Sequence, residues 1–110
     1  MKIAITTFEN NSHSLVPSDL HHTNYFLLLN TDDLNQYKFI PNMYNKTISG
    51  SKIFCSQFLI KQGVDAIICG KNDEQTAQMF ILAGIKIEEM PGARVDEIIK
   101  QISEHSLLNV

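Results

Sequence analysis

The pattern of apolar and polar positions is most regular between residues 49 and 90, where it predicts helix, strand, helix and strand in turn. Cys55 and Leu59 lie four residues apart and therefore share one face of the first helix. The strand that follows, Val64–Cys69, ends in four consecutive apolar residues. Such a run is typical of a strand that is covered on both faces. We therefore expect this strand to be the central one of a sheet.

The second helix of this stretch is predicted to begin at Asn72. The Asn72 side chain can cap the helix, and Gln75 follows three residues later in a capping-box arrangement. Phe80 and Ile81 lie on its predicted apolar stripe. Ile85–Ile87 is then predicted to form a short strand.

The remaining segments contribute three more strands and one more helix. Lys2–Thr6 is a short strand, and Asn24–Leu29 and Leu34–Ile40 form an antiparallel hairpin around a turn of Asn, Thr and Asp residues. Residues 8–23, between the first strand and the hairpin, form a long polar loop, and such loops are often functional. Arg94–Glu104 has apolar residues at helical spacing and is the final helix.

The predicted order, three strands followed by alternating helices and strands, indicates an α/β fold. Two strands joined by a helix are parallel, with a right-handed crossover. The hairpin adds antiparallel strands, so the sheet is mixed, with five strands and three helices. At 110 residues the chain is predicted to form one domain, residues 1–110.

Composition narrows the class of protein. The apolar share is 44%, the charged share 19% and the net charge −3, which disfavours nucleic acid as a partner. We find no secretory signal and no apolar run long enough to cross a membrane, so a cytoplasmic location is expected. The two cysteines, Cys55 and Cys69, are expected to be buried and unpaired in a reducing compartment.

Several catalytic classes find no support in the sequence. A metal-dependent nuclease needs carboxylates on its core strands, but Lys2–Thr6 carries none. The acidic residues instead fall in predicted turns and helix starts, where they complement helix dipoles or face water. No GxSxG or Walker-type motif is present. We therefore expect that the protein is not an enzyme, and a hydrolase is kept only as a remote alternative.

The topology predicts where a small ligand would bind. In open α/β sheets this is the crevice beyond the carboxyl ends of the strands, and helix N-termini there favour anions. Lys52 adds positive charge near this edge. The predicted ligand-binding residues are Thr6, Ser49, Gly50, Ser51, Gly70, Lys71 and Asn72.

A metal site is a second possibility at the same edge. Cys69 ends a strand there, and soft thiolates suit iron–sulfur clusters. Two cysteines cannot supply four thiolates, so either a site shared across a dimer or a histidine of the long loop, His21 or His22, would have to complete it. The alternative is that both histidines are solvated loop residues.

A resemblance to a known family rests on the order and spacing of these segments. The residues that carry it are Gly63–Gly70, Ala77, Ala83–Ile87, the first strand Met1–Ile5 and the pair Tyr25-Phe26. Together they resemble the dinitrogenase iron–molybdenum cofactor biosynthesis family over roughly residues 1 to 103. The resemblance implies a ribonuclease H-like layered fold. It also implies binding or carrying of an iron–sulfur or iron–molybdenum cluster, alongside other assembly proteins.

The sequence departs from the usual pattern of that family at the expected ligand positions. The family's His-Phe-Gly-Arg segment falls on residues 19–22, which places Asp19 at the histidine and His22 at the arginine. A histidine that often precedes the first helix falls on Ser49, and the polar cap of the last helix falls near Arg94.

Two functional hypotheses follow. The first is a small binding protein that holds a metal cluster or another small anionic ligand. The second is a non-enzymatic protein-interaction or regulatory module of the same fold that has lost its metal site. In either case Leu34–Ile40, with Tyr37 and Phe39 and only Lys38 as a charge, is a poorly guarded edge strand, so we expect a homodimer there.

Overall fold

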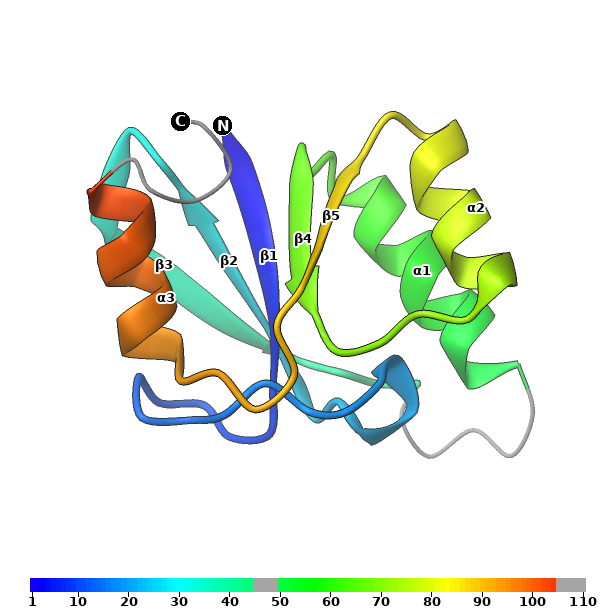
Figure 1. The fold of residues 1–110 in the computed structure, drawn as a ribbon, viewed down its shortest axis with the longest axis horizontal. Coiled ribbons are helices and arrows are strands. Elements are labelled where there is room, and N and C mark those ends of the chain that lie inside the picture. The colour runs from blue at the N-terminus through cyan, green and yellow to red at the C-terminus, as the bar shows by residue number, and fades with distance from the viewer. Residues whose placement is uncertain (45–49, 105–110) are drawn as a thin grey trace.

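The computed structural model describes residues 1–44 and 50–104 and contains one five-stranded sheet flanked by helices (Figure 1). The strands are β1 (Lys2–Thr7), β2 (Tyr25–Asn30), β3 (Asp33–Pro41), β4 (Ala66–Cys69) and β5 (Lys86–Glu89). The α-helices are α1 (Ser51–Lys61), α2 (Glu74–Leu82) and α3 (Val95–Ser103), and η1 (Leu20–His22) is a short 3-10 helix. The predicted order of elements is confirmed, with boundaries that shift by one to two residues at most ends.

The sheet has the order β3-β2-β1-β4-β5. β1 runs parallel to β4 and β4 parallel to β5, whereas β2 is antiparallel to both of its neighbours. The mixed five-stranded sheet with a β2–β3 hairpin is thus confirmed. The prediction that Val64–Cys69 is the central strand is wrong, because β1 holds the middle position. Both strands are buried on two faces, and an apolar run alone does not distinguish the middle strand from its neighbour.

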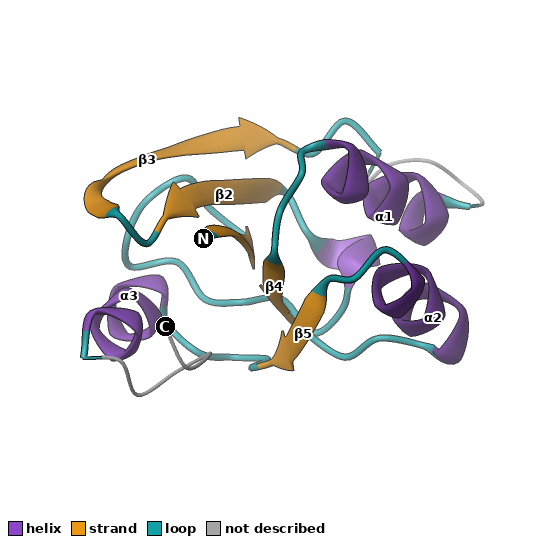
Figure 2. Cartoon of the chain, turned by 90° about the horizontal axis from the view of Figure 1, so that it is seen from above, coloured by secondary structure: helices purple, strands orange, loops and turns teal. Residues whose placement is uncertain are grey.

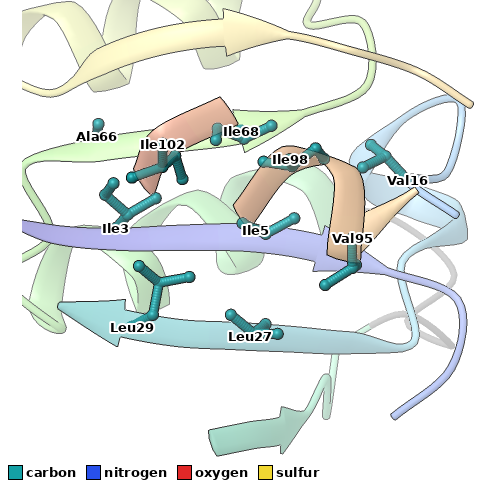
Figure 3. Packing of buried hydrophobic residues seen from close by; sticks show 10 residues of the cluster. All are labelled: Ile3, Ile5, Val16, Leu27, Leu29, Ala66, Ile68, Val95, Ile98 and Ile102. Atoms are coloured by element: carbon teal, nitrogen blue, oxygen red, sulfur yellow. The ribbon is translucent and has the colours of Figure 1, made fainter. Parts of the chain in front are cut away.

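The three helices cover opposite faces of the sheet. Seen from above, α3 lies on one side and α1 and α2 lie together on the other (Figure 2). Under α3, Val95, Ile98 and Ile102 pack against alternate residues of β1 and β2, among them Ile3 and Leu27 (Figure 3). These positions follow the two periods expected from sequence, about 3.6 residues for a helix and two for a strand.

The second core lies under α1 and α2. Cys55 and Leu59 of α1 and Phe80 of α2 are fully buried against Ile67 of β4. One predicted core residue is wrong: Ile81 is 59% exposed. Because successive residues on a helix are turned by about 100°, burying Phe80 directs its neighbour Ile81 away from the sheet.

The long loop before β2 is anchored to the start of α3. Leu15 forms an isolated bridge with Arg94, the Val16 N–H donates to the carbonyl of Ala93 at 2.8 Å, and the Val95 N–H donates to that of Ser14 at 2.9 Å. The loop therefore crosses the carboxyl ends of the strands. Among the described residues, no helix is both long and apolar enough to span a bilayer.

Candidate functional site

The edge beyond the carboxyl ends of β1 and β4 does bring the predicted segments together. α1 and α2 both begin at this edge, which is the lower one in Figure 1. Lys52, in the first turn of α1, lies 3.7 Å from the carboxylate of Asp73 at the start of α2. The Lys71 N–H, in the turn after β4, donates to the carbonyl of Ser18 in the long loop at 2.8 Å. We call this region the strand-end edge.

The N-terminus of α1 is the more open of the two helix ends. Gly50 is its N-cap, with a left-handed backbone at φ 76°, and no capping side chain is bonded there among the described residues. The first turn contains no acidic residue. His21 reaches it from η1, and its Nδ1 lies 2.9 Å from the Ser51 Oγ. The first-turn N–H groups of α1, together with Lys52, therefore favour a negatively charged group.

The N-terminus of α2 is already occupied by the protein's own carboxylates. Asp73, rather than the predicted Asn72, is the N-cap, and it accepts a hydrogen bond from the Thr76 N–H at 2.8 Å. These hydrogen bonds from Thr76 hold the pKa of Asp73 below its usual value. The Asn72 N–H donates instead to Glu89 Oε2 at 2.9 Å. The predicted capping box of Asn72 and Gln75 is wrong, because Asp73 caps α2 one residue later and the Thr76 hydroxyl donates to the Asp73 carboxylate, at 2.9 Å.

Cys69 lies at the strand-end edge but is not accessible there. Its side chain is buried, and the Asn72 Nδ2 donates to its sulfur at 3.2 Å. Burial raises the pKa of the Cys69 thiol to about 11, since the charged thiolate loses its solvation. At neutral pH this residue is a protonated thiol. In this conformation it is not the thiolate ligand predicted from the sequence.

The two histidines are held in separate hydrogen bonds. His21 Nδ1 contacts Ser51, while His22 Nδ1 lies 2.8 Å from Asp19 Oδ1. Their rings are nearly perpendicular, with centroids 5.3 Å apart. Within residues 1–44 and 50–104, no group of three or more His, Cys, Asp or Glu side chains could hold a metal ion.

A comparison with known proteins identifies the family. The sequence model described as dinitrogenase iron-molybdenum cofactor matches residues 1–105. This chain belongs to the dinitrogenase iron-molybdenum cofactor family. A comparison with curated proteins found no match.

Solved structures show the same fold. The apo form of the orange protein from Desulfovibrio gigas superposes with a TM-score of 0.83 at 20% identity, covering 96% of this chain and 88% of that chain. A NifB-like protein from Thermotoga superposes with a TM-score of 0.72 at 24% identity, covering 96% and 89%. At these identities the likeness shows a shared fold.

The described residues of this family member do not fit a cluster ligated by the protein. Cys69 is protonated and buried, and Cys55 is also buried, with a pKa raised by desolvation. Asp19 and His22, which occupy the family's His and Arg positions, bond to each other. Ser49, another predicted site residue, lies outside the described residues.

One buried polar atom at the strand-end edge lacks a partner. The Thr6 Oγ1 is fully buried and makes no hydrogen bond within the described chain. Thr6 follows Ile5, which pairs with Ile68 in the β1–β4 register, so Thr6 lies next to Cys69 across the two strands. This hydroxyl is a donor with unused capacity at the edge where a ligand was predicted.

The long loop packs closely against the turn after β4, at the place where the topology predicted a crevice. A Cβ atom at Gly70 would collide with the backbone carbonyl oxygens of Pro17 and Ser18. The described residues also form hollows that Gly70 does not line. One of about 660 Å³ is lined by the segments around Phe8, Asn24 and Asn42. Another, of about 460 Å³, lies beside β3 near Tyr37. Sequence reasoning gave Asp73 and Glu89 no role at this edge and named Asp19 only through the family's motif, and only the Asp73–Thr76 spacing could have signalled one of these contacts.

The state of Cys69 leads to a prediction about stability at high pH. An unfolded cysteine loses its proton near pH 9, whereas folded Cys69 keeps it until about pH 11. The unfolded state therefore binds fewer protons in this window, so stability falls as pH rises through it, by up to about 2–3 kcal/mol. Urea unfolding at pH 8 and pH 10.5 should show a smaller loss for Cys69→Ala than for the wild type. Equal losses would show that the thiol ionises normally in the folded protein.

Proposed function

We propose that this chain is a small, non-catalytic binding protein of its family. It holds a compact anion, such as a molybdenum-containing oxyanion or an anionic metal cluster, without direct ligation of metal by side chains. The binding place is the N-terminus of α1, with the Gly50–Ser51 backbone and Lys52 as the anchoring groups. Thr6, Gly70, Lys71 and Asn72 form its floor and rim at the strand-end edge.

The main support for this proposal is the difference between the N-termini of α1 and α2. α2 is capped by Asp73, while α1 has neither an acidic first turn nor a capping side chain among the described residues. Lys52 forms an ion pair with the carboxylate of Asp73, at 3.7 Å, and both side chains are substantially exposed. Exposed pairs of this kind are weak, so an incoming anion can replace Asp73 as the partner of Lys52.

We class the sheet as ribonuclease H-like, which is supported by the order β3-β2-β1-β4-β5 with β2 alone reversed. A non-catalytic role is supported by the positions of the acidic residues. Asp19 and Asp73 cap helices, and β1 carries no carboxylate that could hold a catalytic metal. The cytoplasmic location stays a prediction.

Titrations with molybdate and with tetrathiomolybdate, in which binding is measured by calorimetry and by absorption, test the proposal. We expect Lys52→Gln to weaken binding about three- to tenfold, with the wild-type affinity falling as salt is added. Lys61→Gln is the matched control, because Lys61 lies in the last turn of the same helix, and it should change little. Asp73→Asn should strengthen binding, since asparagine still caps α2 but releases Lys52.

A second candidate is the interaction module without a metal site. It is favoured by the hydrogen bond between the side chains of Asp19 and His22, which occupy the family's motif positions. Anaerobic purification with metal analysis separates the two candidates. A folded protein that carries no metal and binds neither probe would overturn the anion proposal and leave the interaction module.

A further inference from the structure

β3 is an open edge of the sheet, and its properties point to a partner. It is bonded to β2 on one side only, extends over nine residues, and has no buried residue along its length. The opposite edge, β5, has only four residues, two of which are Glu88 and Glu89. Short, charged edge strands resist pairing, whereas long ones with few charges do not. β3 carries one lysine, Lys38, inside its length.

The direction of the β3 backbone groups follows from the ladder with β2. The Asn42 N–H donates to the carbonyl of Asn24 at 2.8 Å, and this pair continues the β2–β3 register, which is regular from Tyr37 to Pro41 and shifts between Leu29 and Asn30 of β2. In an antiparallel ladder every second residue directs its N–H and C=O toward the neighbour. The groups of Tyr37, Phe39 and Pro41 therefore point away from β2. Pro41, which has no N–H, is suited to such a position.

We propose that β3 pairs with β3 of a second copy of this chain, antiparallel, around a two-fold axis at Tyr37. The two sheets then form one continuous sheet across the dimer. At the axis, Tyr37 of each copy exchanges both backbone hydrogen bonds with Tyr37 of the other. This inference is independent of the anion proposal, because it uses residues of β3 (Asp33–Pro41) and none of the residues of the proposed anion site.

Charge and proline select this register over two neighbouring ones. An axis at Lys38 would place the two lysines directly opposite each other, which is destabilising. An axis at Phe39 would align Tyr37 with Pro41 of the second copy and lose a hydrogen bond on each side, since proline has no N–H. An axis at Tyr37 instead places Lys38 opposite the neutral Gln36 of the second copy.

The side chains at the axis support the same arrangement. Tyr37 is 38% exposed, and its ring makes an edge contact with that of Phe39, with centroids 5.9 Å apart. Pairing around Tyr37 brings the two aromatic pairs together on one face of the joined sheet. Cross-strand aromatic pairs are among the more stabilising contacts of antiparallel sheets. A second copy therefore covers both the open backbone and the exposed ring.

Sedimentation equilibrium over a wide concentration range tests the dimer. We expect a reversible monomer–dimer equilibrium for the wild type. Tyr37→Lys places like charges at the axis and removes the aromatic pair, and should raise the dimer dissociation constant about tenfold or more. Gln75→Lys makes the same charge change at an exposed position of α2 and should leave the constant unchanged. Circular dichroism establishes that both variants are folded.

A second variant tests the register itself. Gln36→Glu places a carboxylate opposite Lys38 of the second copy, twice per dimer, and should lower the dissociation constant about two- to fivefold at low salt. A weaker dimer in this variant would overturn the register. A wild type that stays monomeric at every concentration, or a Tyr37→Lys variant that dimerises normally, would overturn the proposal. Dimerisation and anion binding are measured separately, so failure of one does not imply failure of the other.

Discussion

Ile67→Asp is expected to give a protein that does not fold. Ile67 is fully buried in β4, in the core shared with α1 and α2. An aspartate there would bury a charge without an opposite charge or hydrogen-bond donors, at a cost of several kcal/mol. That cost is comparable with the whole stability of a small domain, about 5–15 kcal/mol. Circular dichroism and urea unfolding measure the effect.

The matched control for this substitution is Ile81→Asp. Ile81 has the same side chain but is 59% exposed on α2, so the new carboxylate stays in water. We expect its free energy of unfolding to change by less than about 1 kcal/mol. A cooperatively folding Ile67→Asp protein would show that β4 is not in the core. An unfolded Ile81→Asp protein would show that the outer face of α2 is covered.

Gly70→Ala should destabilise the protein by disturbing the strand-end edge. The added Cβ would meet the backbone carbonyls of Pro17 and Ser18, and backbone atoms cannot rotate away as the end of a long side chain can. We expect a loss of about 1–3 kcal/mol, which is typical of overpacking. We also expect faster hydrogen exchange at the Lys71 amide, because its bond to Ser18 would break.

Lys71→Ala is the control for Gly70→Ala. It leaves the backbone bond from residue 71 to Ser18 in place and removes only an exposed side chain, so stability and amide exchange should stay close to the wild type. Together the two variants separate the close approach of the loop from the charge at the edge. Normal stability and normal exchange in Gly70→Ala would mean that the loop does not rest on this turn.

The apolar pattern of the sequence determined most of the fold. Ile98 and Ile102 recur at helical spacing and face the sheet, and Ala66–Cys69 forms a strand buried throughout. These predictions succeed because a helix or strand repeats its geometry every few residues, so local sequence states which side is covered. The edge position of β3 was predictable for the same reason: β3 has few consecutive apolar residues, whereas a strand covered on both faces has an unbroken apolar run.

The site depended on contacts that no local pattern records. The N-terminus of α2 became unavailable because Glu89, seventeen residues away along the chain, reaches the Asn72 N–H. Cys69 was expected to be a ligand but is a protonated thiol, because it is buried in the core that residues of α1 and α2 share. The sequence by itself determined which residues arrive at the strand-end edge, through the crossover rule for parallel strands. Only the tertiary structure decided which of their polar groups were already satisfied, because hydrogen bonding and desolvation depend on neighbours that are distant in sequence.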